Sequence, residues 1–267
     1  MESDWLEQKS IVIIGGTAGI GWAAANSFID HGARVVVVGH DDASVNNASA
    51  KLGSNGIALK GEATAPGTAS DAIDTCIKTF GSFDGLYHVA GGSGRQYGDG
   101  PLHEMSLEGW NKTFTLNLTS LMLSNQAAVR MFLQRKVKGT ILNIGSVLGS
   151  SPSPKYFVTH AYAASKAAVE GFSRSIAAYY AANGIRINVL APGLVDTPMA
   201  QRATQDAAIM KFIATKQPLE NGRIGHPDDL VGAALYFMSE HSKFTTGQVL
   251  HVDGGWSLSE GQYDAAL

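Results

Sequence analysis

The sequence predicts an α/β protein in which a parallel sheet of about seven strands carries helices on both faces. Short apolar, β-branched runs alternate with segments of helical periodicity along the chain. The strand-like runs are apolar throughout rather than at every second position, which indicates strands buried on both faces. Because no repeat or linker interrupts this alternation, we expect one domain over residues 1–267, a doubly wound sheet in which crossover helices join parallel strands.

Each expected element follows from a local pattern. Apolar runs ending in glycine or another turn residue predict strands at 10–14, 33–38, 56–60, 85–90, 140–144, 186–190 and 248–252. Apolar residues three or four positions apart predict helices at 21–31, 41–53, 68–80, 106–136, 160–183 and 227–239. Residues 199–217 interrupt the alternation, and such inserts in α/β enzymes often close over a site. We therefore predict a substrate lid there.

Composition excludes several classes of protein. The 267 residues are 45% hydrophobic and 16% charged, which predicts a large core rather than disorder. The formal net charge is −3 and no Lys/Arg run occurs, so no nucleic-acid partner is expected. The acidic start and the lack of a long apolar run predict neither a signal peptide nor membrane insertion, hence a cytoplasmic location. The single Cys76 has helical core spacing, and we predict no metal site.

A glycine-rich turn follows the first predicted strand. Gly15 permits a tight turn, Gly19 lets the backbone approach a pyrophosphate, and Gly21 allows close helix packing. The following helix offers free N–H groups to an anion. This context predicts dinucleotide binding by Gly15, Thr17, Ala18, Gly19, Ile20 and Gly21.

The end of the second predicted strand bears on the choice between NAD and NADP. An acidic residue there binds the ribose hydroxyls and would repel a 2′-phosphate. This chain has Gly39 and then His40, which favours NADP(H) with His40 facing the phosphate. Asp41 and Asp42 follow and could instead turn inward to hold a ribose, so NAD(H) stays possible.

Tyr162 and Lys166 are four residues apart on a predicted helix and therefore share one face. Tyrosine alone titrates near 10, too high for a good base at neutral pH. A positive charge about 4 Å away is worth about 4 kcal/mol at an effective dielectric of 20. We therefore expect Lys166 to lower the pKa of Tyr162 by up to about 3 units, into the working range of an acid/base catalyst.

Taken together, these segments resemble the short-chain dehydrogenase/reductase family over nearly the whole chain. Further matching motifs are Leu116-Asn117-Leu118, Asn143-Ile-Gly-Ser146, Pro192-Gly-Leu-Val-Asp-Thr197, Gly222–Pro227 and Thr246–Gly255. Three departures occur: Ile14 replaces the family's threonine before the glycine turn, Glu62-Ala-Thr replaces Asp-Val-Thr, and His88-Val-Ala-Gly91 replaces Asn-Asn-Ala-Gly. We expect His88 to be a strand-end histidine bonded to backbone, not a catalyst. The loop from Ser146 to Tyr162 is three residues longer than usual in the family.

The resemblance implies a Rossmann-like fold and specific roles. Tyr162 would act as general acid/base, Ser146 would bind the substrate oxygen, Lys166 would hold the nicotinamide ribose, and Asn117 would keep a water behind Lys166. Asn117, Tyr162 and Lys166 would thus also serve cofactor binding, joined by Glu62, Ala63, Ala90, Gly91, Val195 and Thr197. It also implies a homotetramer built on long helices, with Met131, Phe132, Phe172, Ile176, Tyr179 and Tyr180 as interface residues or, equally, as core.

The predicted function is hydride transfer between a nicotinamide and a ketone or secondary alcohol, with a small-molecule substrate. One alternative is a catalytically silent NAD(P)-binding regulator, which the intact Asn117, Ser146, Tyr162 and Lys166 oppose. Another is a 3-oxoacyl-carrier reductase, against which the uncharged Tyr179, Tyr180 and Asn183 count. We expect Leu148, Ser150, Phe157, Val158, His160 and the insert to line a moderately apolar pocket.

Overall fold

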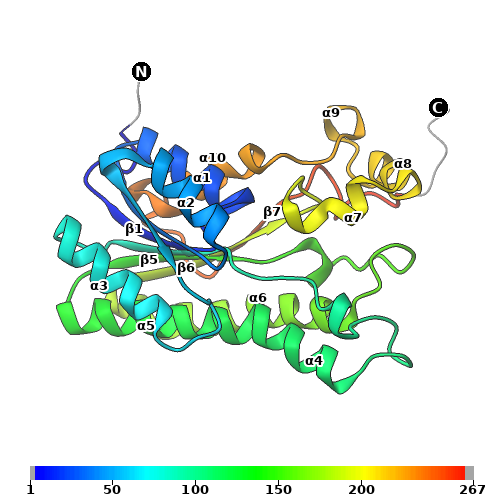
Figure 1. Ribbon diagram of the computed structural model, residues 1–267, viewed down its shortest axis with the longest axis horizontal. Coiled ribbons are helices and arrows are strands. Elements are labelled where there is room, and N and C mark those ends of the chain that lie inside the picture. The colour runs from blue at the N-terminus through cyan, green and yellow to red at the C-terminus, as the bar shows by residue number, and fades with distance from the viewer. Residues whose placement is uncertain (1–3, 262–267) are drawn as a thin grey trace.

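A seven-stranded parallel sheet organises the computed structural model, which describes residues 4–261 (Figure 1). The strands are β1 (Ser10–Ile14), β2 (Arg34–Gly39), β3 (Gly56–Lys60), β4 (Gly85–His88), β5 (Gly139–Ile144), β6 (Ile185–Pro192) and β7 (Val249–Val252). They lie in the order β3-β2-β1-β4-β5-β6-β7, and every neighbouring pair is parallel. The predicted fold class is confirmed.

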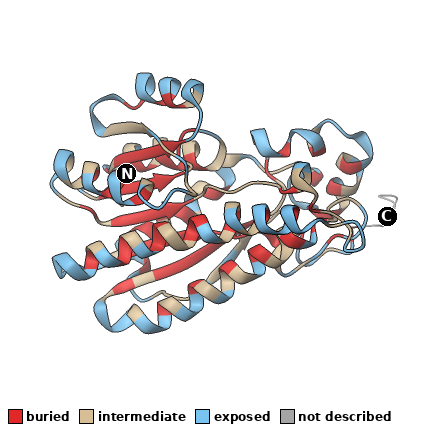
Figure 2. Ribbon diagram, turned by 60° about the horizontal axis from the view of Figure 1, so that its bottom comes forward, coloured by how far each residue is buried: buried red, intermediate tan, exposed pale blue. Residues whose placement is uncertain are grey.

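Helices cover both faces of the sheet (Figures 1 and 2). One layer contains α1 (Gly19–Asp30) and α10 (Val231–Met238), with α2 (Asp42–Lys51) against the edge strand β3. The other layer contains α3 (Thr68–Phe80), α5 (Ser120–Arg135) and α6 (His160–Tyr180). No helix within residues 4–261 has the length and apolar character needed to cross a membrane.

Two apolar clusters fill the space between the sheet and these layers. Phe28 of α1 packs with alternate side chains of β1 and β2 on one side of the sheet. On the other side Phe132 of α5 is fully buried and stacks on Phe83, with ring centroids 4.8 Å apart. Of the two alternatives left open for Phe132, core or subunit interface, the structure thus supports the core. Cys76 lies in the same cluster, as its helical spacing predicts.

The helix predicted over 106–136 is broken into two. Helix α4 (Leu107–Phe114) and α5 are joined by a π-helical turn, Thr115–Thr119. Inside this turn the Asn117 side chain donates a hydrogen bond to the Thr113 carbonyl over 2.9 Å. A backbone carbonyl of the helix thus accepts a hydrogen bond from a side-chain amide. π-Helical turns of this kind frequently mark functional sites.

The insert at 199–217 is helical, and its apolar side joins a satellite core. It contains α7 (Gln201–Thr204) and α8 (Ala207–Lys216), followed by the short α9 (Leu219–Gly222). The Asp206 carboxylate caps α8 by accepting the amides of Ala208 and Ile209, at 2.9 and 3.1 Å. Ile209 and Ile213 pack with Val147 and Trp256, which holds the insert against the loop after β5.

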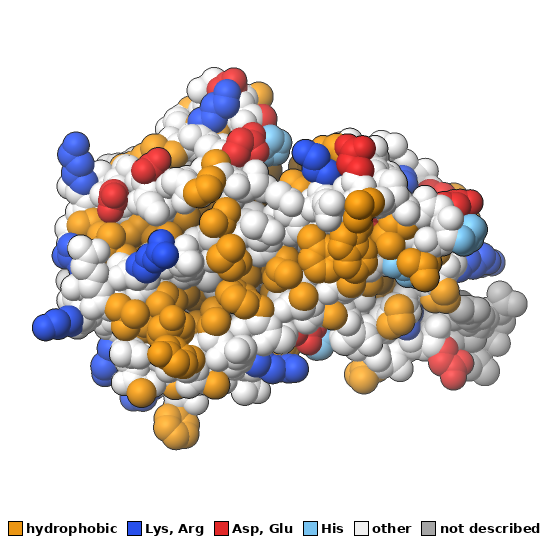
Figure 3. Space-filling model, turned by 90° about the horizontal axis from the view of Figure 1, so that it is seen from below, with side chains coloured by type: hydrophobic (Ala, Val, Ile, Leu, Met, Phe, Trp, Pro, Cys, Tyr) orange, Lys and Arg blue, Asp and Glu red, His pale blue; other side chains and the backbone are white. Residues whose placement is uncertain are grey.

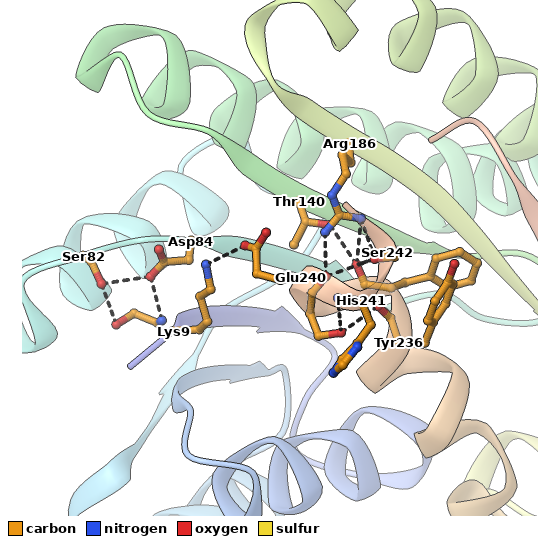
Figure 4. A network of polar contacts seen from close by, with 12 residues as sticks. Lys9, Ser82, Asp84, Thr140, Arg186, Tyr236, Glu240, His241 and Ser242 are labelled. Atoms are coloured by element: carbon orange, nitrogen blue, oxygen red, sulfur yellow. Dashed lines mark hydrogen bonds and ion pairs between the residues drawn. The ribbon is translucent and has the colours of Figure 1, made fainter. Parts of the chain in front are cut away.

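A polar network lies at the amino-terminal ends of the strands (Figure 4). The Arg186 guanidinium, at the start of β6, donates to Ser242 Oγ over 2.7 Å and to the carbonyls of Phe237 and Ser239 at 3.2 and 3.1 Å. Burial lowers the pKa of Arg186 from its ordinary value. This network links the start of β6 to the end of α10. It lies at the end of the sheet opposite to the carboxyl ends of the strands.

Candidate active site

One cavity of about 800 Å³ opens at the carboxyl ends of the strands. It runs between the loops after β1 and β4, where the strand order reverses, the usual ligand crevice of such sheets. Fifteen of the predicted residues line it: Gly15, Thr17, Ala18, Gly19, Ile20, His40, Glu62, Ala63, Ala90, Gly91, Ser146, Tyr162, Lys166, Val195 and Thr197. Gly21 and Asn117 are not among its lining residues.

The glycine turn has the shape that a pyrophosphate requires. A Cβ at Gly15, whose φ is +84°, would lie 2.6 Å from the amide nitrogen of Ala90. A Cβ at Gly21 would lie 2.1 Å from the Gly15 carbonyl oxygen, so Gly21 acts in packing rather than in lining the cavity. No side chain caps the start of α1, so its first amides face the cavity. These residues fit a dinucleotide.

Beyond the glycine turn, the two aspartates that follow β2 both have partners. A Cβ at Gly39 would lie 2.1 Å from Thr17 Oγ1, so a larger residue there would displace Thr17. The Asp41 carboxylate accepts the Ser44 amide over 2.8 Å and caps α2, and the Ser44 hydroxyl and amide lower its pKa. Asp42 pairs with Lys60 over 2.8 Å at the surface. Exposed His40 remains on the wall.

Tyr162 and Lys166 lie side by side, with the Lys166 ammonium 5.6 Å from the centre of the tyrosine ring. Lys166 is buried, donates to the Ile144 carbonyl over 3.1 Å, and has its pKa lowered by burial to about 8. The expectation that Lys166 lowers the pKa of Tyr162 is wrong in this structure. Desolvation raises that pKa, and the Ser146 hydroxyl offsets only part of the rise.

The first turn of α6, which carries Tyr162, is held by a residue that the sequence analysis missed. The buried Asp99 carboxylate accepts the backbone amides of Ala161 and Tyr162, each over 3.0 Å. A carboxylate at this position also interacts favourably with the positive end of the helix dipole. Asp99 is more than sixty residues away in sequence, so no local pattern marks it.

Asn117 lies beneath the cavity floor and braces it. Its carboxamide accepts the Gly92 amide over 3.1 Å and donates to the Gly92 carbonyl over 2.8 Å. A Cβ built on Gly91 would lie 2.7 Å from Asn117 Oδ1 and 3.6 Å from Lys166 Nζ. Asn117 is thus adjacent to the loop that borders Lys166, and it fixes that loop after β4.

His88 is fully buried at the end of β4 and has side-chain neighbours besides the expected backbone contact. Its Nδ1 lies 2.7 Å from the Ser124 hydroxyl, its Nε2 lies 3.4 Å from that of Ser120, and the Ala90 backbone also forms a hydrogen bond with it. Burial, with a smaller contribution from the charge of Lys166, lowers the pKa of His88 to about 3. A neutral imidazole therefore lies behind the site.

The remaining wall of the cavity is more cationic than the sequence suggested. Leu148 and Phe157 line it, whereas Ser150, Val158 and His160 do not. Ser150 instead lies 3.2 Å from His251 Nε2. Met199 and Arg202 of the insert line the cavity as expected, whereas Arg95, Tyr97 and Trp256 are lining residues that the sequence analysis missed.

A glycine-lined crevice that fits a dinucleotide, beside a tyrosine and a buried lysine, defines a class of nicotinamide-dependent oxidoreductases. A family model described as Enoyl-(Acyl carrier protein) reductase matches residues 15–257. The chain is 33% identical over 260 residues to 2-(S)-hydroxypropyl-CoM dehydrogenase 3 of Xanthobacter autotrophicus (strain ATCC BAA-1158 / Py2), covering 95% of this chain and 98% of the relative. It is 32% identical over 254 residues to cis-4-hydroxycyclohexanecarboxylate dehydrogenase of Sinomonas cyclohexanicum, covering 94% and 97%.

Solved structures agree with these sequence relationships. A short-chain type dehydrogenase/reductase from Mycobacterium ulcerans superposes with a TM-score of 0.85 at 27% identity, covering 95% of this chain and 91% of that one. The crystal structure of gox2181 superposes with a TM-score of 0.87 at 27% identity, covering 97% and 99%. The chain belongs to the short-chain dehydrogenase/reductase family and is an oxidoreductase of that family.

With Tyr162 as the expected acid/base, its raised pKa predicts different pH profiles for the two directions of reaction. A raised pKa keeps the phenol protonated to higher pH, so the proton-donating form needed for reduction is already complete at neutral pH. Oxidation needs the phenolate, whose fraction grows about tenfold per pH unit below the pKa. We expect kcat/KM for alcohol oxidation to rise steeply with pH while that for ketone reduction stays level near neutrality. Stopped-flow profiles that are flat for oxidation up to about pH 9 would contradict this.

Proposed function

We propose that Tyr162 is the general acid/base in hydride transfer between a nicotinamide dinucleotide and a ketone or secondary alcohol. The observation that carries this proposal is the meeting of Ser146, Tyr162 and Lys166 on the wall of the crevice that begins at the glycine turn. The nicotinamide, when bound, supplies or accepts the hydride. The protein then has to orient the substrate and manage one proton.

Each side chain has a separate task in this proposal. In reduction, the Tyr162 hydroxyl donates its proton to the oxygen of the carbonyl as that oxygen gains charge. The Ser146 hydroxyl, oriented by the Leu148 amide 3.2 Å away, donates to the same oxygen. Lys166 stabilises the phenolate that remains and holds the nicotinamide ribose, and Asn117 fixes the loop beside Lys166 and keeps a water there.

The same proposal assigns the cofactor to the lined crevice. The pyrophosphate would lie at Gly15, Thr17, Ala18, Gly19 and Ile20, with Gly21 packing behind. Glu62, Ala63, Ala90 and Gly91 would border the adenosine and ribose, and Val195 and Thr197 the carboxamide. The names of the two relatives support an alcohol substrate, since they specify a hydroxypropyl group and a hydroxycyclohexanecarboxylate.

Replacing Tyr162 by phenylalanine tests the central assignment. We expect kcat to fall by about 10²- to 10⁴-fold, the usual contribution of a positioned proton donor, while the Kd of the reduced cofactor changes little. Turnover is followed by loss of NAD(P)H absorbance, and cofactor binding by fluorescence. The exposed Tyr179→Phe is the matched control and should behave as wild type. Full activity in Tyr162→Phe would remove tyrosine from the mechanism.

NADP(H) is the favoured cofactor in this proposal. Its support is Gly39 in place of an acid, together with the engagement of Asp41 with α2 and of Asp42 with Lys60. His40 is then the side chain free to meet a 2′-phosphate.

We expect His40→Ala to weaken NADPH binding by about three- to tenfold, the value of one hydrogen bond, and NADH binding by less than about twofold. Fluorescence titration with each cofactor measures both constants. His103→Ala, an exposed histidine that does not line the cavity, is the control. Equal weakening of both cofactors would exclude a phosphate-binding role for His40.

We also propose a homotetramer. Apolar side chains gather on the face formed by α4, α5 and α6 (Figure 3), where Leu133 and Tyr179 are 41% and 77% exposed. Patches of this kind mark protein interfaces.

Light scattering should give four times the 28.1 kDa of one chain, and Tyr179→Glu should reduce that mass because it places a charge within the interface. Leu102→Glu, at an exposed apolar residue elsewhere, should leave the mass unchanged. A monomeric wild type would contradict the proposal.

Residues 199–217 are proposed as the substrate lid of a single catalytic domain spanning 1–267. Met199, Ala200, Arg202 and Ala203 of this segment line the cavity, which supports a covering role. A cytoplasmic location stays a prediction of the sequence.

A further inference from the structure

We propose that Arg95 and Arg202 form a binding site for a carboxylate or sulfonate group, so that the substrate is a ketone or secondary alcohol with an anionic end. This inference rests on the proposed function, because it names the class of substrate that the same cavity takes. Both arginines line the cavity that contains Ser146 and Tyr162.

The two guanidinium groups converge from different parts of the chain. Arg95 begins a short 3₁₀ turn, Arg95–Tyr97, in the loop after β4, and Arg202 lies in α7. Each donates to the same backbone carbonyl, that of Tyr156, over 3.4 and 3.2 Å. One neutral carbonyl oxygen is therefore shared by two full positive charges, and each guanidinium has several further N–H donors.

Neither arginine has an acidic partner within ion-pair distance among residues 4–261. The carboxylate that acts on Arg95 is Asp99, whose two oxygens already accept the amides of Ala161 and Tyr162. Burial, and after it the charge of Arg202, lowers the pKa of Arg95 from its ordinary value, and the charge of Asp99 opposes this. The cavity wall thus holds two guanidinium groups that form no ion pair among residues 4–261.

The aromatic and aliphatic side chains around the arginines favour a ligand that joins a small anionic group to an apolar remainder. The Arg202 guanidinium lies 5.9 Å from the centre of the Phe157 ring, and Phe157 in turn meets the edge of Trp256 at 5.5 Å. A planar guanidinium held beside an aromatic ring presents a fork of N–H donors that matches carboxylate or sulfonate oxygens. Leu148, Phe157 and Trp256 would enclose the alkyl or ring portion.

The position of the arginines assigns them to the substrate rather than to the cofactor. The cradle for a pyrophosphate is built from Gly15 and Gly19, and the ribose wall lies at Gly39 and His40. Arg95 and Arg202 instead share their backbone partner in the loop that precedes α6, next to the Phe157 side chain. An anion bound there would leave the other end of its molecule facing Tyr162.

Binding of two unreactive probes tests the site directly. Cyclohexanecarboxylate and its uncharged analogue cyclohexanecarboxamide are titrated calorimetrically into the enzyme saturated with reduced cofactor. We expect the carboxylate to bind at least about tenfold more tightly, as charge-assisted hydrogen bonds imply. Arg95→Gln and Arg202→Gln should each reduce this preference to about twofold or less, and Arg202→Lys should retain part of it. Arg135→Gln, an exposed arginine at the end of α5, is the matched control and should keep the wild-type preference.

The corresponding ketones, 4-oxocyclohexanecarboxylate and 4-oxocyclohexanecarboxamide, separate this inference from the proposed function. The ratio of their kcat/KM values should favour the carboxylate in the wild type and collapse in the two glutamine variants. Equal binding of the two probes by the wild type overturns the anion site, and reduction of both ketones would then still support the dehydrogenase. A carboxylate preference without reduction of either ketone supports the anion site and counts against the proposed reaction. Weaker NAD(P)H binding in both glutamine variants, with the probe preference intact, assigns the arginines to the cofactor and overturns the inference.

Discussion

The rest of the site depends on the buried ammonium group of Lys166, which forms no ion pair with a carboxylate among residues 4–261. Lys166 is 3% exposed, and its partners are the Ile144 carbonyl and the face of the Tyr162 ring. Burying an unpaired charge is costly, which is why the pKa of Lys166 falls to about 8. The neighbouring groups are accordingly neutral: His88 has lost its charge to burial, and Asn117 and Ser146 carry none. A cation in such surroundings is available to stabilise a charge that develops during the reaction.

The loop after β4 links this cation to the substrate end of the cavity. Asn117 fixes Gly92 from one side, and Asp99 holds the start of α6 from the other. Arg95 lies between these two anchors, so its position follows from the same contacts that place Tyr162. The π-turn at Thr115–Thr119 is part of this arrangement, because it turns the Asn117 carboxamide toward Gly92. The residues proposed to transfer the proton and to bind the substrate are therefore positioned by hydrogen bonds that all involve the loop after β4.

The fold could be predicted closely because buried parallel strands leave a strong local signal. β1, β3 and α3 have the predicted bounds, and each is a continuous apolar run or a clear helical stripe ending at a turn residue. The residues expected around the cofactor gather on one cavity because their motifs are local in sequence and end at the same edge of the sheet. The break in the helix at 115–119 has no proline or glycine to announce it. Asp99, Arg95 and Arg202 act through partners about 46 to 63 residues away, which periodicity cannot show.

The electrostatic properties of the site likewise depend on tertiary contacts that a local sequence pattern does not show. Whether a lysine four residues from a tyrosine lowers the pKa of the phenol depends on how exposed both groups are to solvent. Here desolvation raises the pKa of Tyr162 instead. Likewise, the formal net charge of −3 indicates no particular partner, yet two arginines that form no ion pair among residues 4–261 line the cavity. Surface charges are screened within about 8 Å at physiological ionic strength, so the field inside a cavity depends on the few groups that line it. The glycine turn with its helix N-terminus and the arginine pair line the same cavity, and both are suited to anions. A dinucleotide and an anionic substrate would therefore each find a separate group of donors, with Tyr162 on the wall of the cavity that they share.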